Sequence, residues 1–313
     1  MTAQTRGDPT WYTPAALPDE LRTLDRPIMG GLQVGAPGKV GLLELAFEQC
    51  GGTTRVVRHY QRAPLHVYRP IHLDESFPGM AFVFVQQFGD GYVDGDRCRI
   101  DVDCGPGTTA HVTTQTATNL YRTPRNFATQ LVNLRVGPRA VLEYLPDAIV
   151  PFRGARFFQR TCMTIDVDST AIVGEVLLPG RVARGERHAY GFYWAETEAR
   201  RPDGGLLFAD LIRLCPAESG GTRSLALLGG WDVLATLYVV TGKGRAHELV
   251  ELLRRGTTQE GVIIGASTLP NDCGASARFL GSTSQAVCAA MRSAWGAARE
   301  ALLGAPAPYL RKG

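Results

Sequence analysis

Short apolar or alternating segments, separated by turn residues, run through most of this 313-residue chain. They begin near Gly38 and include VGLLELAFEQ, TRVVRHYQR, MAFVFVQQF, RCRIDVDC, TAHVTTQTA and AIVGEVLLPG. Many are rich in β-branched residues, and clusters of Gly, Pro, Asp or Asn divide most of them. Regularly spaced short strands with turn signals are typical of layered all-β folds. The pattern therefore predicts a mainly β protein, with a large layered β-sandwich-like or helical β architecture.

Helical periodicity appears only late in the chain. Residues 245–255 place Leu249, Leu252 and Leu253 on one face of a helix. A second helix is expected to start at Ser282, because Gln285 three residues later completes a capping-box pattern. About two α-helices are thus expected in the C-terminal part. The segment GVIIGASTLP between them is predicted to be a buried strand.

The first 36 residues differ from the rest of the chain. They are rich in Pro, Gly, Asp and Thr and show no periodicity, so residues 1–36 are predicted to be a loose N-terminal extension. Trp11 and Tyr12 are the residues expected to dock it. Residues 37–313 are expected to form a single β-rich domain, since all-β domains often exceed two hundred residues. Within this domain, RRPDGG at 200–205 is a strong signal for a hairpin turn between two strands.

Composition and charge exclude several classes of function. The formal net charge is +3 and no basic run reaches five residues, so nucleic-acid binding has little support. The start of the chain has no basic segment followed by an apolar one, and the longest apolar stretch, 225–240, is too short to span a bilayer. The seven cysteines form no C-x-x-C pair, which favours a reducing compartment. We therefore expect a cytoplasmic protein without membrane contact.

The segment from Tyr92 to Arg122 looks at first like a metal site, because it holds four aspartates, two cysteines and a histidine. Strand parity argues against this interpretation. Cys98 and Cys104 fall on one face of RCRIDVDC, about 20 Å apart at roughly 3.3 Å per residue, too far to share one ion. The aspartates at 101 and 103 alternate with arginines on the other face. We predict core cysteines, an outer ion-pair ladder and a hairpin closed by GlyProGly at 105–107.

Motifs for catalysis are incomplete. The chain has neither G-x-S-x-G nor H-E-x-x-H, and the TGKG segment at 241–244 lacks the remaining residues of a P-loop. We therefore predict that the protein is not an enzyme. The alternative is a β-sandwich hydrolase that uses a carboxylate pair such as Asp94 and Asp96, which would have to lie about 5–9 Å apart in a cleft.

Seven stretches, in family order, resemble the urease accessory protein family UreD, also called UreH. They are GKVGLLELAF, YQRAPLHVYRP, DGDRCRIDVDCGPGTTAHVTTQTATNLYR, LEYLPDAIVPFRGARFFQRT, GEVLLPGRVARGERH, IIGASTLP and PYLRK. The resemblance covers roughly residues 38–313. This chain departs from the family pattern in the glycine turn at 89–96 and at Asn119, where the family favours lysine. Those departures motivate a second hypothesis, a divergent paralogue that matures another metalloenzyme.

The resemblance implies a mostly β, non-enzymatic scaffold or metallochaperone. Such proteins bind UreF, which bridges to the GTPase UreG, and the assembly docks on apo-urease to deliver nickel. A channel through the UreD-like protein is the proposed route of the ion. No tightly bound cofactor is implied, only nickel in transit. A homodimeric arrangement through the complex is also implied.

Candidate contacts of the ion follow from the resemblance and from ligand chemistry. Nickel in transit suits loosely held oxygen and imidazole ligands, because tight thiolate sites would trap it. The candidates are the acidic or hydroxyl residues of the family-like stretches: Asp96, Thr114, Glu143, Asp147 and Glu175. The candidate partner contacts are Gln115, Tyr121 and Arg122.

Each candidate for the ion route also has a structural alternative. Asp96 would cap its turn, and Thr114 would pair across strands. Glu143 and Asp147 would be surface charges. Glu175 would form an ion pair with one of two nearby arginines, Arg181 or Arg184.

Overall fold

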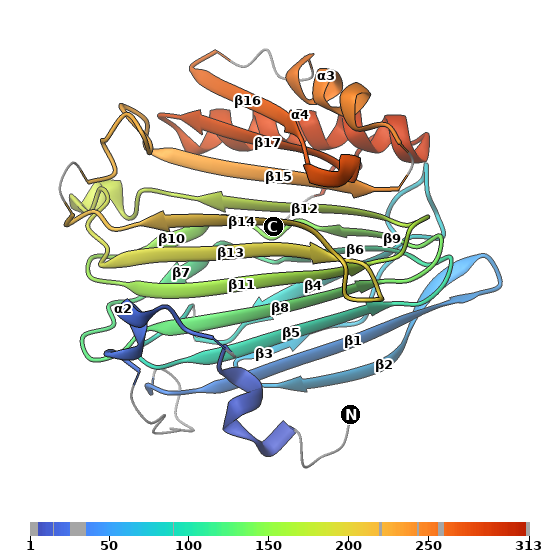
Figure 1. The fold of residues 1–313 in the computed structure, drawn as a ribbon. Coiled ribbons are helices and arrows are strands. Elements are labelled where there is room, and N and C mark those ends of the chain that lie inside the picture. The colour runs from blue at the N-terminus through green and yellow to red at the C-terminus, as the bar shows by residue number, and fades with distance from the viewer. Residues whose placement is uncertain are drawn as a thin grey trace.

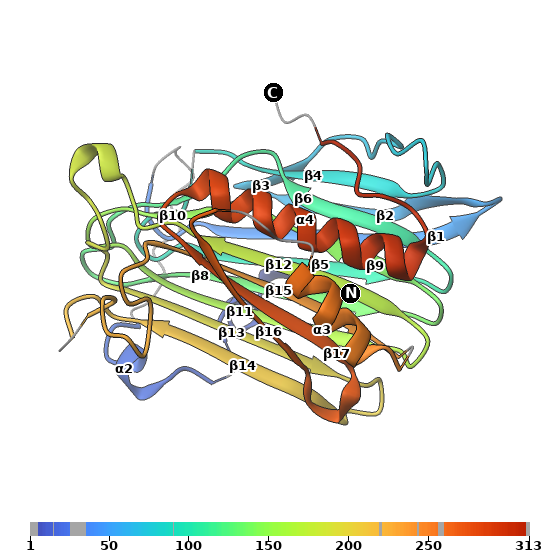
Figure 2. The same ribbon diagram turned by 90° about the horizontal axis from the view of Figure 1, so that it is seen from above.

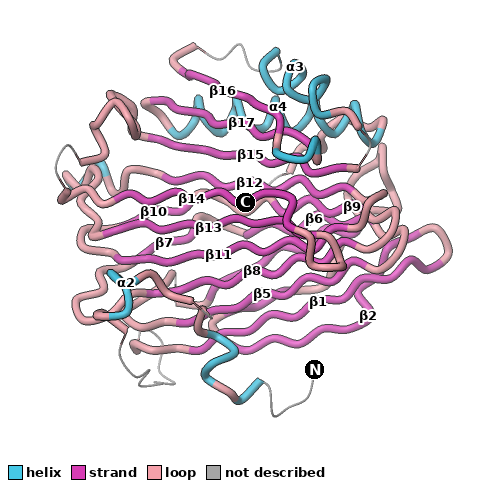
Figure 3. The backbone as a smooth tube through the Cα atoms, viewed as in Figure 1, coloured by secondary structure: helices cyan, strands magenta, loops and turns pink. Residues whose placement is uncertain are grey.

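Two stacked β-sheets form the body of the molecule, and helices cover one of them (Figure 1). The computed structural model describes residues 6–14, 16–25, 36–89, 91–218, 221–242, 244–255 and 260–310. Strands dominate the backbone trace in Figure 3, so the predicted mainly β class is confirmed. The layered arrangement of the sheets is confirmed as well.

The first sheet has seven strands. In spatial order they are β14 (Leu206–Leu214), β13 (Phe192–Arg200), β11 (Arg156–Ile165), β8 (Ala128–Val136), β5 (Arg97–Cys104), β1 (Val40–Cys50) and β2 (Thr53–Arg62). The five from β13 to β1 run parallel, and an antiparallel strand closes each edge. One of these edges is the β13–β14 hairpin, which confirms the turn predicted at residues 200–205.

The second sheet has ten strands. Its main path is β16 (Val262–Thr268), β17 (Gly274–Gly281), β15 (Val233–Thr241), β12 (Thr170–Leu177), β9 (Val141–Tyr144), β6 (Thr109–Thr114), β4 (Ala81–Gln87) and β3 (Leu65–Val67). The short strands β7 (Thr118–Leu120) and β10 (Ile149–Pro151) pair with each other, and β10 also pairs with β12. Strands β4, β6, β9 and β12 are mutually parallel.

Successive strands alternate between the two sheets, which explains the parallel pairing. The chain passes from β5 in the first sheet to β6 in the second, then to β8, β9, β11 and β12 in alternation. Parallel neighbours need a long crossover, usually a helix. Here a strand of the opposite sheet serves as that crossover. The helical β architecture that the sequence predicts is therefore a chain that winds repeatedly from one sheet to the other.

The hairpin predicted at GlyProGly is wrong. Strand β5 lies between β1 and β8 in the first sheet, whereas β6 belongs to the second sheet. Residue Gly107 has a φ of 68°, which suits the sharp change of direction between the layers. Both neighbouring positions of β5 are filled by parallel strands, so β6 has no free edge to pair with. The predicted side-chain parity is nevertheless confirmed, because Cys98, Ile100, Val102 and Cys104 are all buried.

Apolar side chains fill two layers. The main core lies between the sheets and includes Phe47, Ile100, Val132 and Leu142. A second core lies between the ten-stranded sheet and two helices, α3 (Ala246–Arg255) and α4 (Ser284–Leu303). Figure 2 shows both helices on the same side of this sheet. The remaining short elements are α2 (Asp19–Arg22), η1 (Pro9–Tyr12), η2 (Val182–Arg184) and η3 (Pro270–Asp272).

Both predicted C-terminal helices are present, although details differ. Thr283, not Ser282, caps α4, because its Oγ1 accepts a hydrogen bond from the Ala286 amide at 3.3 Å. The strand predicted to be buried, β16, is instead an edge strand with exposed positions that alternate with packed ones. Ile263 is 53% exposed. The sequence GVIIGASTLP is apolar enough for a buried strand, but only one face of β16 packs against the helices.

The N-terminal extension docks on the outer face of the seven-stranded sheet. The Arg99 guanidinium carbon lies 3.5 Å from the centroid of the Trp11 ring, and Tyr12 is buried. Further along, Leu21 packs into a separate aromatic cluster on this face. Trp11 and Tyr12 therefore dock the extension, as the sequence indicated.

Candidate functional site

A cavity of about 210 Å³ lies between the two sheets. Four of the eight residues predicted for the site line it: Thr114, Tyr121, Asp147 and Glu175. The amide side chains of Gln86, Gln87, Gln130 and Gln159 add further polar atoms to its walls. Most of the space between the sheets is apolar core, so this polar cavity is a local exception. Its oxygen-rich lining could hold water or a hard or borderline cation briefly.

Glu175 brings a carboxylate to this cavity. It lies on β12, and the side chain of Gln159, on β11 of the opposite sheet, donates a hydrogen bond to its Oε2. Burial disfavours the charged form and raises the pKa of Glu175 to about 7. The alternative of an ion pair with Arg181 or Arg184 is wrong, because Glu175 forms no ion pair with either among the described residues, and Arg181 lies 2.6 Å from Glu186 instead. Glu175 is thus a carboxyl that can exchange a proton near neutral pH.

Thr114 and Asp147 meet on another wall of the cavity. The Asp147 backbone amide donates a hydrogen bond to Thr114 Oγ1 at 2.8 Å. This bond ties the loop after β9 to the end of β6. The loop also separates the cavity from an outer groove, since Pro146, Asp147 and Val176 line both spaces. Asp147 therefore lies at the boundary between the cavity and the groove.

Asp96 occupies a turn and is not among the residues that line the cavity. Its Oδ1 accepts from the Lys39 amide at 2.8 Å and its Oδ2 from the Val93 amide at 2.9 Å. Burial raises the pKa of Asp96 to about 6, while these backbone donors act in the opposite direction. The structural alternative for this residue, a turn cap, is therefore confirmed.

The carboxylate pair of the hydrolase alternative is also engaged in this turn. Asp94 is buried, and its Oδ1 accepts from the Asn126 amide at 2.9 Å. Its Oδ2 accepts from Arg125 Nε at 3.3 Å. Both Asp94 and Asp96 therefore stabilise local backbone, and neither lines the cavity.

Glu143 is fully buried on the other side of the ten-stranded sheet, under α4. Its Oε1 accepts from Trp295 Nε1 at 3.0 Å and from Arg299 Nε at 2.9 Å. Its Oε2 lies 2.8 Å from His111 Nδ1. The alternative of a surface charge is wrong for Glu143. Three donors already occupy this carboxylate.

His111, Trp295 and Arg299 were not predicted as members of a site. Arg299 is fully buried and also contacts Asp74, so two carboxylates surround one guanidinium. The alternation in β6 gives a partial indication of His111, because this polar residue lies between the apolar residues Ala110 and Val112. No sequence pattern indicates Trp295 or Arg299, because α4 reaches Glu143 only through packing on the sheet. Glu143 and Arg299 are 156 positions apart in the chain.

The predicted partner contacts lie close together along the chain but differ in exposure. Tyr121 packs edge-on against Phe152, with ring centroids 4.9 Å apart. Arg122 is exposed. The Gln115 backbone amide donates to the Val85 carbonyl at 2.8 Å, which extends the pairing of β6 with β4. Of these three residues, Tyr121 alone lines the cavity.

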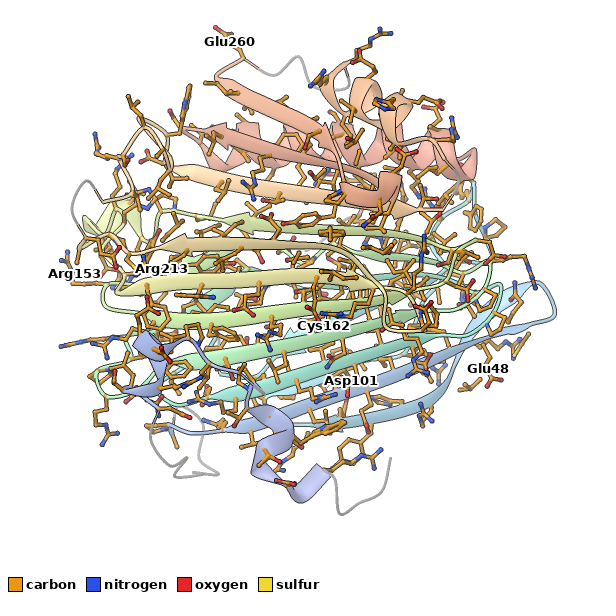
Figure 4. All side chains as sticks on the ribbon, viewed as in Figure 1. Glu48, Asp101, Arg153, Cys162, Arg213 and Glu260 are labelled. Carbon is orange, nitrogen blue, oxygen red and sulfur yellow. The ribbon has the colours of Figure 1, made fainter. Side chains whose placement is uncertain are left out.

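The aspartates and cysteines of the 92–122 segment do not gather into one metal site among the described residues. Figure 4 shows Asp101 and Cys162 on the outward face of the seven-stranded sheet. There Asp101 accepts from Arg99 Nε at 2.9 Å and from Asn133 Nδ2 at 2.6 Å. Across residues 6–310, leaving aside the undescribed gaps, no three His, Cys, Asp or Glu side chains gather as metal ligands would. Among the described helices, none has the length and apolar character needed to cross a membrane.

Comparison with known proteins gives a consistent result. The model of the family described as UreD urease accessory protein matches residues 39–313. A urease accessory protein UreD 2 of Streptomyces griseus is 42% identical over 282 residues, which cover 90% of this chain and 96% of that protein. UreD of Cenarchaeum symbiosum is 34% identical, over 91% of this chain and 100% of its own length. UreD 2 of Brucella suis is 37% identical, over 88% and 92%.

Proposed function

This chain belongs to the UreD family of urease accessory proteins, and we propose that it delivers nickel to apo-urease without catalysing a reaction itself. In this proposal it acts in the cytoplasm with a UreF-like protein and a UreG-like GTPase. Nucleotide hydrolysis belongs to the GTPase, in keeping with the incomplete P-loop of this chain. A homodimeric arrangement through the complex is part of the same proposal.

The polar cavity between the sheets supports the proposal most directly. Glu175, Asp147 and Thr114 supply oxygen atoms there, and the described part of the cavity wall contains no cysteine. Oxygen ligands hold Ni²⁺ weakly enough to release it. A carboxyl group with a pKa of about 7 exchanges a proton for the ion at little cost. We therefore assign the transit role to these three residues and a structural role to Asp96 and Glu143.

Nickel loading of urease in a co-expression system tests this assignment. Glu175→Gln keeps the hydrogen-bonding capacity of the side chain but removes the charge. We expect it to lower the nickel content of urease at least several-fold, while the accessory complex still assembles. Glu48→Gln, at an exposed position of β1, is the matched control. Full nickel loading with Glu175→Gln would rule out the cavity as the route.

A different client enzyme is the second candidate function. Asn119 lines the cavity at the position where the family favours lysine, so the chemistry of the route differs locally. Co-purification with tagged urease subunits separates the two candidates. Recovery of urease supports the first proposal, and recovery of another metalloenzyme supports the second.

A further inference from the structure

Three crossovers from the second sheet to the first lie at one end of the molecule. They join β6 to β8, β9 to β11 and β12 to β13, and their residues are 115–127, 145–155 and 178–191. The three starting strands are parallel, and so are the three that follow, which brings the crossovers together. The Thr123 amide donates to the Gly154 carbonyl at 3.3 Å, and the Gly154 amide donates to the Ala189 carbonyl at 2.9 Å. The polar cavity lies at this same end, because residues of the first two crossovers line it.

The charges on these crossovers are unequal. They carry six arginines, Arg122, Arg125, Arg153, Arg181, Arg184 and Arg187, against two carboxylates, Asp147 and Glu186. The crossovers at the opposite end, residues 105–108, 137–140 and 166–169, have the reverse balance, with one arginine and two aspartates. Both sets connect the same two sheets, so the excess of arginine is a property of this end. Figure 4 shows Arg153 there.

Half of the six arginines already have a carboxylate partner, and half do not. The paired ones are Arg125, Arg181 and Arg187. The other three, Arg122, Arg153 and Arg184, are exposed, and none forms an ion pair with a carboxylate among the described residues. We call these three the arginine surface. A guanidinium group presents a planar fork of donors that binds a carboxylate through two parallel hydrogen bonds. The arginine surface can therefore pair with carboxylates from outside the chain.

The surroundings favour a protein over a nucleic acid or a small ligand. Single-stranded nucleic acids are bound by basic grooves in which bases stack on exposed aromatic rings. Here Phe127, Phe152 and Tyr190 are buried, and the half-buried Tyr121 packs against Phe152. The arginine surface lines neither the cavity nor the outer groove, so it does not enclose a small molecule. Exposed arginines are enriched where proteins contact one another.

We propose that the arginine surface is the docking site for an acidic face of a protein partner. Carboxylates of that face pair with Arg122, Arg153 and Arg184. The position beside the cavity gives the contact a second effect. Guanidinium groups without a counter-charge repel a cation, and a docked acidic face removes that repulsion. Docking would thus favour entry of a cation into the cavity, a step that rests on the proposed function because it takes a cation as the cargo.

Fluorescence anisotropy with a labelled peptide of ten glutamates tests the arginine surface on the purified chain. We expect the triple variant Arg122→Glu, Arg153→Glu and Arg184→Glu to weaken the dissociation constant at least tenfold at low salt, because three attractive charges become repulsive. The affinity of the wild-type chain should fall as the salt concentration rises.

A second triple variant is the matched control. Arg55→Glu, Arg135→Glu and Arg139→Glu change three other exposed arginines, so the net charge changes by the same amount. We expect its dissociation constant to stay within about threefold of the wild-type value, because exposed charges more than a Debye length away are largely screened. Circular dichroism checks that both variants fold. Equal weakening in the two variants, or no binding by the wild-type chain, overturns the proposal.

Two further measurements test the other occupants. If a ten-base thymidine oligonucleotide binds more tightly than the peptide, and the first triple variant loses that binding, the surface serves a nucleic acid and the proposal is wrong. Self-association of the wild-type chain in light scattering, lost in the same variant, would assign the surface to a second copy of the chain instead. None of these measurements depends on nickel. The nickel-loading test of Glu175→Gln can therefore fail or succeed independently of them.

Discussion

Arg299 Nε lies 2.9 Å from Glu143 Oε1, and both side chains are completely buried. This contact joins α4 to β9, and Asp74 completes the arrangement from the loop before β4. Breaking a buried ion pair by removing one partner leaves an uncompensated charge. The pair therefore fixes the position of α4 on the sheet, and with it one wall of the outer groove.

Arg299→Met is expected to lower the free energy of unfolding by about 3–5 kcal/mol, because Glu143 and Asp74 would remain buried without their shared cation. Urea denaturation followed by circular dichroism measures the change. Arg255→Met, at an exposed position of α3, should alter the value by no more than about 0.5 kcal/mol. A loss below about 1 kcal/mol in Arg299→Met would contradict the structural role given to this pair.

Glu175→Gln is expected to make stability less dependent on pH. The folded-state pKa of Glu175, about 7, lies above its ordinary value of 4.5, so the folded state binds the proton more tightly than the unfolded state. Wild-type stability should therefore fall as pH rises from about 4.5 to 7. The variant has no carboxyl to ionise and should gain about 1–3 kcal/mol relative to wild type at pH 8.

Unfolding in urea at pH 5 and at pH 8 provides the measurement. The advantage of Glu175→Gln should be largest at pH 8 and several-fold smaller at pH 5, where most of the loss has not yet occurred. Glu48→Gln, with its exposed side chain, serves as the control. Equal effects of Glu175→Gln at both pH values would show that the carboxyl does not titrate in the cavity.

Strand periodicity predicted the layers of this fold but not their connections. The alternation in RCRIDVDC correctly separated buried Cys98 and Ile100 from the outer Asp101. It could not show that the next strand joins the other sheet, because a glycine turn looks the same in a hairpin and in a crossover. The pairing of β5 with β1 and β8 depends on contacts distant in sequence.

For the candidate site, too, local sequence patterns predict some features, and contacts between distant residues decide the others. The side-chain chemistry of Thr114, Asp147 and Glu175, and their place in family-like stretches, indicate a site, and all three line one cavity. Glu143 meets the same criteria, but its side chain points into the opposite layer, where Arg299 of α4 neutralises it. Which face of a sheet a carboxylate occupies follows from register and parity. What covers that face is decided by a helix about 150 residues away, and no local pattern encodes it.

Asp96→Ala is expected to cost about 1–3 kcal/mol of stability, because the part-buried amides of Lys39 and Val93 would lose their acceptor. Asp203→Ala removes a similar turn bond, from the Gly205 amide, at an exposed site. There water replaces the lost acceptor, and we expect a smaller loss. Thermal unfolding of the two variants compares them directly. Nickel loading of urease, divided by the amount of folded Asp96→Ala protein, should equal the wild-type value. A lower value would show that Asp96 takes part in the ion route.

The N-terminal extension offers a final test, because it covers an aromatic cluster on the seven-stranded sheet. Leu21 is buried against a cluster that contains Phe127, Phe158 and Trp194. Leu21→Ala should reduce the free energy of unfolding by about 2 kcal/mol, at the low end for buried leucines, since a peripheral cavity can collapse or admit water. Trp194 fluorescence should change at the same time, as its surroundings become more polar. Leu225→Ala, at a position 95% exposed, is the control and should have an effect below about 0.5 kcal/mol. If Leu21→Ala and Leu225→Ala have the same free energy of unfolding, the extension does not stabilise the folded domain in solution.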